Sequence, residues 1–191
     1  MTLINIKEKD NFCVDNKRVQ IKFNLIPGKL IRLIGANGVG KSSFIQYLKL
    51  NQDSFFLNKK VSYLDQQRLL PLNDVSLNDL KELLLKKRYE IIKCIDVIEE
   101  ETSFFSSKPI KELSGGQNQL VKIYLSLFLS GDVFILDEPF QFLDEKNQQK
   151  MLKIIGQLKS LNKEILIVEH HFDLKDIVDE KVELQSEKKW T

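Results

Sequence analysis

A glycine-rich segment between a short apolar run and a helical pattern constrains this chain more than any other feature. The apolar run covers residues 29–34, and from residue 41 the side chains Phe44, Ile45 and Leu48 recur at helical spacing without Gly or Pro. The segment between them fits the pattern G-x-x-x-x-G-K-[ST]. Its residues are Gly35, Ala36, Asn37, Gly38, Val39, Gly40, Lys41 and Ser42, with Ser43 next. We therefore predict a strand, an anion-binding loop and a helix; a plain glycine turn is the alternative.

The residue types of this loop suit phosphate groups. Glycines let the backbone turn tightly and aim successive N–H groups at phosphate oxygens, and the N-terminus of the following helix adds positive potential. Lys41 is expected to reach the β and γ phosphates of a nucleotide, and the hydroxyl of Ser42 is expected to bind Mg²⁺. The loop thus predicts a site for a nucleotide and a divalent cation.

Strand and helix patterns alternate along the rest of the chain. The strands are expected at 2–7, 19–25, 61–64, 133–136 and 165–168, and the helices at 77–100 and 145–160. Strands that alternate with helices are typical of an α/β fold with a parallel sheet.

The composition is that of one globular domain, with 191 residues of which 42% are hydrophobic. A net charge of +2 gives no general attraction to nucleic acid, and no nucleic-acid partner is expected. Cys13 and Cys94 lie far apart and form no C-x-x-C pair, so neither a disulfide framework nor a metal knuckle is indicated. The longest apolar stretch, 120–129, is too short to span a bilayer. A role at a membrane would therefore need another subunit.

Two carboxylates, Asp137 and Glu138, directly follow an apolar run. This places them at the carboxyl end of a buried strand, where open α/β sheets bind their ligands. Asp137 is expected to hold Mg²⁺ through its water shell, and Glu138 to polarise the water that attacks the γ-phosphate. A solvated strand end is the alternative interpretation.

A second glycine segment precedes the helical pattern that begins near residue 120. It consists of Leu113, Ser114, Gly115, Gly116 and Gln117. Ser114 offers an N-cap oxygen and the two glycines expose N–H groups, so this is a second anion-binding helix N-terminus. With these residues and the phosphate loop, the sequence resembles the ATP-binding cassette (ABC) family. It departs from the family pattern after Gln117, where a basic residue is usual and this chain has Leu120.

The resemblance covers nearly the whole chain and implies the architecture of a P-loop NTPase. A RecA-like parallel-sheet core would carry an N-terminal antiparallel β subdomain and a small α-helical subdomain at about 67–128, within a single domain of residues 1–191. It also implies that two copies face head to tail around two ATP molecules. In such a dimer each copy completes the nucleotide site of the other.

Four further residues match motifs of the family. Gln66 matches the glutamine that reaches Mg²⁺ and the attacking water, with an exposed loop residue as the alternative. Asp144 matches the aspartate that links the two sites across the dimer, although a helix N-cap is a compatible alternative. His170 matches the histidine that contacts the γ-phosphate, against a solvated surface histidine. Phe12 is the candidate for stacking on adenine, and a core aromatic is its alternative.

The resemblance implies an ATPase that hydrolyses ATP as a subunit of an ABC transporter. Its cofactors would be ATP and Mg²⁺, and its partners a second ABC subunit, identical or related, and integral membrane subunits that carry the cargo. It would lie in the cytoplasm, peripherally on the inner face of a membrane. A non-transport ABC ATPase, such as a soluble assembly scaffold, is the alternative.

Overall fold

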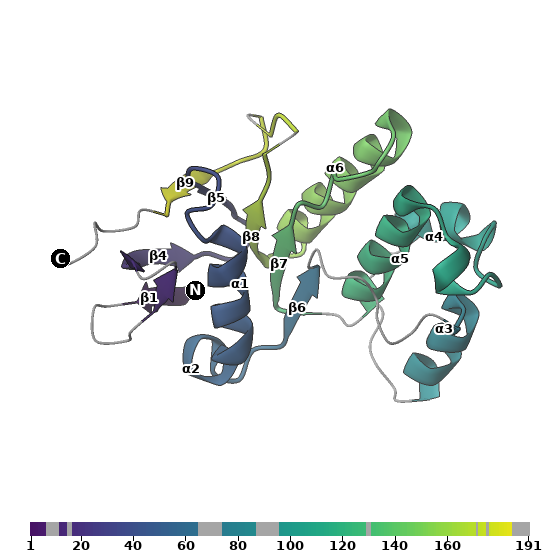
Figure 1. Ribbon diagram of the computed structural model, residues 1–191, viewed down its shortest axis with the longest axis horizontal. Helices are drawn as coiled ribbons and strands as arrows, with labels where there is room; N and C mark the ends of the chain where they lie inside the picture. Colours follow the sequence, from purple (N-terminus) through teal and green to yellow (C-terminus); the bar gives the residue numbers. More distant parts are fainter. Residues whose placement is uncertain are drawn as a thin grey trace.

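A five-stranded parallel sheet forms the centre of the molecule (Figure 1). The computed structural model describes residues 1–6, 12–14, 17–64, 74–86, 96–128, 131–170, 172–174 and 176–184. In spatial order the strands are β6 (Val61–Leu64), β7 (Val133–Asp137), β8 (Glu164–Val168), β5 (Leu30–Ile34) and β9 (Glu180–Glu183). All neighbouring pairs are parallel, so the carboxyl ends of the strands share one edge of the sheet.

The N-terminal part of the chain is antiparallel. Strand β1 (Thr2–Ile6) pairs with β4 (Ile21–Leu25), and a short ladder joins β2 (Cys13–Val14) to β3 (Lys17–Arg18). Along β4 the side chains of Ile21, Phe23 and Leu25 are buried while Lys22 is exposed, as the period-two pattern predicted. The expected antiparallel β element beside a parallel core is confirmed.

Helices flank the sheet in two groups (Figure 1). Near the sheet lie α1 (Lys41–Leu50), α2 (Gln52–Phe56) and α6 (Glu145–Ser160). At one end of the molecule lie α3 (Leu77–Lys86), α4 (Asp96–Ser103), the short 3-10 helix Ile110–Glu112 and α5 (Gly115–Phe128). The helical pattern predicted at 77–100 corresponds to α3 and α4, and residues 87–95 between them lie outside the described residues. The subdomain boundaries at about 67–128 stay a prediction.

Strand β7, an interior strand of the sheet, is buried on both faces. Phe134 and Leu136 belong to the core cluster under α5 and α6, whereas Val133 and Ile135 belong to the cluster that includes the buried face of α1. Alternate side chains of a strand point to opposite faces, so helices on both sides require an all-apolar strand. This explains why β7 reads as a continuous hydrophobic run.

Strand β9 was not predicted. It has the sequence Glu-Lys-Val-Glu with one apolar residue, yet it pairs in parallel with β5 at the edge of the sheet. Its position is fixed partly by Asp179, whose carboxylate accepts a hydrogen bond from Leu30 N (2.8 Å) and ion-pairs with Lys159 (2.7 Å). In the ranges that the structure describes, no helix has both the length and the apolar character needed to cross a bilayer.

Candidate functional site

The glycine-rich loop joins β5 to α1 at the carboxyl edge of the sheet. Gly40 is the N-cap of α1 and has φ of 101°, a left-handed conformation that favours glycine. No side chain caps this helix at Gly40, and its first turn holds no acidic residue. Ser42 and Ser43 are exposed in that turn. The predicted order of strand, loop and helix is confirmed, and the N-terminus of α1 is suited to an anion.

Lys41 folds back over this loop. Its ammonium group donates hydrogen bonds to the carbonyl oxygens of Gly35 (2.8 Å) and Ala36 (2.7 Å). Burial lowers the pKa of Lys41 from its ordinary value, while the negative charges of Glu138 and Asp137 oppose this shift. The lysine therefore lies within electrostatic reach of both predicted carboxylates.

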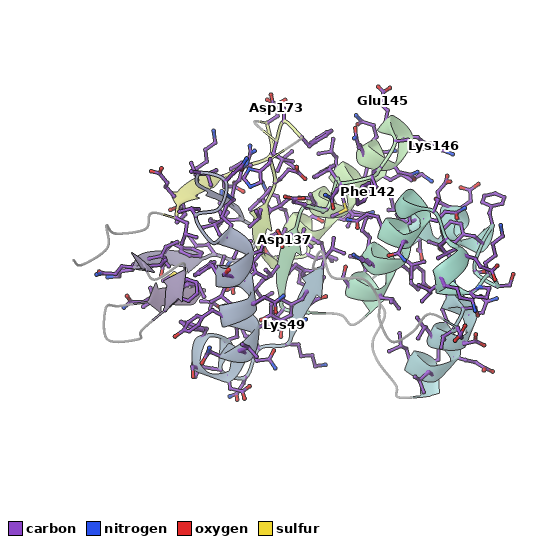
Figure 2. All side chains as sticks on the ribbon, viewed as in Figure 1. Lys49, Asp137, Phe142, Glu145, Lys146 and Asp173 are labelled. Atoms are coloured by element: carbon purple, nitrogen blue, oxygen red, sulfur yellow. The ribbon has the colours of Figure 1, made fainter. Side chains whose placement is uncertain are left out.

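The two carboxylates occupy the carboxyl end of β7. Asp137 is buried, pairs in register with Val168 of β8, and lies in the middle of the molecule (Figure 2). Glu138 follows with φ of 49° and donates its N–H to Val168 O at 2.8 Å. A non-glycine residue in this region of φ is uncommon, and such conformations are concentrated at functional sites.

His170 lies at the end of the neighbouring strand β8 with its side chain exposed. Its pKa is lowered from the ordinary value, first by partial desolvation of the ring and then by the positive charge of Lys41; Glu138 opposes this shift. The site thus brings together Lys41, Asp137, Glu138 and His170, which the sequence spreads over about 130 positions. Gln66 lies outside the described residues.

The second glycine segment opens α5 with a reciprocal cap. Gln117 N donates to Ser114 Oγ at 3.3 Å, and Ser114 N donates to Gln117 Oε1 at 3.1 Å. This pair is a capping box, and it confirms the N-cap interpretation of Ser114. A Cβ added at Gly116 would lie 2.9 Å from the carbonyl oxygen of Phe142, so this position requires glycine for the close approach of the two backbones.

Asp144 caps α6 and accepts a hydrogen bond from Asn147 N at 2.9 Å. The compatible alternative, a helix N-cap, is therefore confirmed, and its role across a dimer stays a prediction. Two residues earlier, Phe142 has φ of 62° and a side chain that is 68% exposed (Figure 2). This loop is the one that packs against Gly115 and Gly116.

Phe12 lies in the core cluster that contains β4 and α1. Its side chain is only 6% exposed, and its ring centroid lies 4.7 Å from that of Tyr47 and 6.0 Å from that of Phe44. Stacking on a base needs an accessible ring face. The packing therefore favours the core aromatic, the alternative that the sequence left open, over a contact with adenine.

Comparison with known proteins decides the family. A sequence model of the family described as "ABC transporter" matches residues 19–141. The chain belongs to the ATP-binding cassette family. This match contains the phosphate loop, the Ser114 segment, Asp137 and Glu138.

Similar sequences are described as ATP-binding proteins. An uncharacterized ABC transporter ATP-binding protein of Methanocaldococcus jannaschii is 32% identical over 81% of this chain and 62% of its own length. A manganese transport system ATP-binding protein of Listeria innocua is 29% identical over 88% of this chain and 78% of its own length. A zinc import ATP-binding protein of Buchnera aphidicola is 30% identical over 78% of this chain and 66% of its own length.

Solved structures of ABC cassettes share the fold. The ATP-binding subunit of an ABC transporter superposes with a TM-score of 0.77 at 19% identity, over 96% of this chain and 85% of that one. A dimeric bacterial ABC transporter cassette superposes with a TM-score of 0.70 at 18% identity, over 95% of this chain and 94% of that one. The predicted P-loop NTPase fold is confirmed.

One residue of this cassette that the sequence did not single out joins the helix of the second glycine segment to the backbone that follows β7. Gln119, buried on α5, donates from Nε2 to the carbonyl oxygens of Glu138 and Pro139, both at 3.3 Å. It lies one helical turn before Ile123, on the buried face of α5. In the sequence, this contact could have been suspected only because Gln119 is a polar residue on the apolar face of the predicted helix.

Proposed function

We propose that this chain is the ATP-binding and ATP-hydrolysing subunit of an ABC transporter, which dimerises around two ATP molecules and powers transport through separate transmembrane subunits. The observation that carries the proposal is the convergence of Lys41, Asp137, Glu138 and His170 at the carboxyl ends of β5, β7 and β8. Ligands of open parallel sheets bind at this edge. The relatives, which are described as ATP-binding proteins, support the same conclusion.

The chemistry proposed for this site is positioning and charge stabilisation. Lys41 and the first N–H groups of α1 hold the phosphates, which requires the ammonium to leave the carbonyl oxygens of Gly35 and Ala36. Glu138 accepts a proton from the attacking water, and His170 contacts the γ-phosphate. Gln66 is proposed to orient the same water.

A magnesium ion fits the donors that are present. The hydroxyl of Ser42 and the carboxylate of Asp137 are hard oxygen ligands, and the field of Asp137 reaches Lys41 at the phosphate loop. Ser42, Asp137 and Gln66 would hold it. When bound, Mg²⁺ neutralises charge on the phosphates.

The dimer is proposed because one copy separates its two phosphate-binding segments. In Figure 1, α1 lies by the central sheet, and α5 lies in the helical group toward one end of the molecule. In a head-to-tail pair, Ser114, Gly115, Gly116 and Gln117 of one copy close on the nucleotide held by the loop of the other. The second subunit is either an identical copy or a related cassette.

We propose that a membrane partner carries the cargo and that this subunit lies in the cytoplasm, on the inner face of the membrane. The manganese and zinc systems among the relatives make a divalent metal ion the first cargo to test. Co-purification with an integral membrane protein from detergent-solubilised membranes supports transport. A purely soluble complex contradicts it.

The decisive variant is Glu138→Gln. It keeps the size of the side chain and removes the proton acceptor, so turnover is expected to fall by about 10²–10⁴-fold while ATP-bound dimers persist. Phosphate release measures turnover, and size-exclusion chromatography with ATP and Mg²⁺ measures dimers. Glu145→Gln, at an exposed position in the first turn of α6 (Figure 2), is the matched control with wild-type turnover. Unchanged hydrolysis in Glu138→Gln rules out the proposed base.

A further inference from the structure

A buried carboxylate without an assigned role lies beside the site. Glu169 follows β8, precedes His170 and is 1% exposed. A buried carboxylate is costly unless hydrogen bonds compensate for the lost water. The contacts of Glu169 therefore indicate the role of this carboxylate.

The two carboxylate oxygens of Glu169 bind different loops. Oε2 accepts a hydrogen bond from Phe140 N at 3.4 Å, in the loop that follows β7 and begins with Glu138. Oε1 accepts one from Phe172 N at 3.2 Å, in the loop that follows β8 and contains His170. One side chain thus connects the segment of the proposed base with the segment of the proposed γ-phosphate contact.

Two further contacts involve the same loops. The rings of Phe140 and Phe172 stack with centroids 4.2 Å apart and an interplanar angle of 3°. Arg32 of β5 donates from Nη2 to the carbonyl oxygen of Glu169 at 2.6 Å. The loops that follow β7 and β8 and a side chain from the middle of β5 therefore meet at Glu169.

Glu169 also lies within electrostatic reach of its neighbour. The pKa of His170 is lowered by partial desolvation and by Lys41, and the charges of Glu138 and then Glu169 oppose this. The negative charge of Glu169 therefore acts on His170 besides fixing the backbone around it.

We propose that Glu169 is a positioning residue that sets the distance between Glu138 and His170, and that it thereby controls hydrolysis without contacting ATP. This inference rests on the proposed ATPase function. Misplacement of a reacting group by about 1 Å costs up to about 100-fold in rate, so a small shift between these loops has a measurable effect.

The same strand provides a matched control. Glu164, at the other end of β8, is 2% exposed and accepts a hydrogen bond from Lys59 at 2.7 Å. Both carboxylates are buried and both are bound, but only Glu169 touches the loops of the site. Loss of the hydrogen bonds of either residue should lower stability, whereas only loss of those of Glu169 should lower turnover.

The experiment compares Glu169→Gln with Glu164→Gln. In Glu169→Gln the amide group places a donor against one of the two backbone N–H groups, so one loop loses its acceptor. We expect kcat to fall by about 10-fold or more with KM for ATP changed by less than about twofold, measured below the melting temperature of both variants. Glu164→Gln is expected to keep the wild-type kcat. Equal kcat values in wild type and Glu169→Gln, or equal losses in both variants, overturn the inference.

Phe172→Leu provides a second route if Glu169→Gln fails to fold. It removes the ring stack and leaves the carboxylate, and it should also lower kcat at constant KM. If Glu169→Gln does fold, the effects of the two variants on kcat should be less than multiplicative in the double variant, because both loosen one connection. Wild-type kcat in Phe172→Leu, or fully multiplicative effects, contradicts the proposal. An inactive wild-type protein would instead refute the proposed function itself.

Discussion

Helices α1 and α5 begin with glycine-rich segments, but the two N-termini are completed in different ways. At α1 the N-cap is Gly40, no side chain caps the helix, and the adjacent Lys41 binds carbonyl oxygens of its own loop. At α5 the cap is closed within the chain, because Ser114 and Gln117 exchange two hydrogen bonds. A helix N-terminus carries up to four N–H groups without partners inside the helix, so α1 depends more on outside acceptors.

The comparison separates a helix N-terminus that is left open within one copy from one that is already braced within one copy. The N-terminus of α1 has no side-chain cap and has a cation that is bound only to carbonyl oxygens of its own loop, features that suit an anionic ligand. The N-terminus of α5 is braced by its capping box and by Phe142, whose backbone lies against Gly116. We expect substitutions at α1 to affect nucleotide turnover most, and substitutions at α5 to affect stability measurably without nucleotide.

The largest effect is expected at α1, for Lys41→Met. The methionine keeps most of the apolar stem and removes the charge that would stabilise the phosphates, so kcat/KM should fall by about 10²–10³-fold. Phosphate release at varied ATP concentration measures this. Lys49→Met, in the last turn of the same helix, should retain wild-type turnover. Full activity in Lys41→Met would break the comparison, since α1 would then not be the phosphate site.

The next effect is expected at α5, for Gly116→Ala. The new Cβ would lie 2.9 Å from Phe142 O, which is too close, so the loop after β7 must shift. The free energy of unfolding should fall by about 1–3 kcal/mol, measured by urea denaturation without nucleotide.

Gly156→Ala in α6 is the control for replacing a helical glycine by alanine where no close contact results. No atom lies within 4 Å of a Cβ added there, and the position is inside a helix. Alanine should therefore raise the free energy of unfolding by about 0.5–1 kcal/mol. If Gly116→Ala also raises the free energy of unfolding, that result contradicts the close packing of Gly116 against the backbone of Phe142.

The parts of the site that depend on local sequence were predictable. The phosphate loop, the carboxylates that end β7 and the cap by Ser114 each follow from adjacent residues, because a turn, a strand end or an N-cap is determined within a few positions. The parallel core followed from alternating patterns. These predictions needed no knowledge of long-range contacts.

The remainder depends on contacts between distant residues. Strand β9 has little apolar pattern and forms because β5 offers an open edge and Asp179 binds Leu30 N. The carboxylate of Glu169 has a role only because Phe140 and Phe172 come to lie on either side of it. Phe12 could be assigned to the core only from its ring partners. No spacing in a single sequence encodes these juxtapositions.

The smallest effect is expected for the cap of α5 itself. Ser114→Ala removes the acceptor for Gln117 N and should lower the free energy of unfolding by about 1 kcal/mol, measured by urea denaturation without nucleotide. Ser43→Ala, at an exposed serine in the first turn of α1, is the control and should change it by less than about 0.5 kcal/mol.

A double-variant cycle tests whether the cap acts as a unit. Gln117→Ala removes the acceptor for Ser114 N, so each single variant disrupts one half of a reciprocal pair. Once either hydrogen bond is lost, the other is weakened. The double variant should therefore lower the free energy of unfolding by less than the sum of the two single variants. Additive costs would mean two independent bonds. Equal costs for Ser114→Ala and Ser43→Ala would mean that α5, like α1, begins without an effective side-chain cap, and the contrast between the two helices would then rest on Gly116 and Phe142 alone.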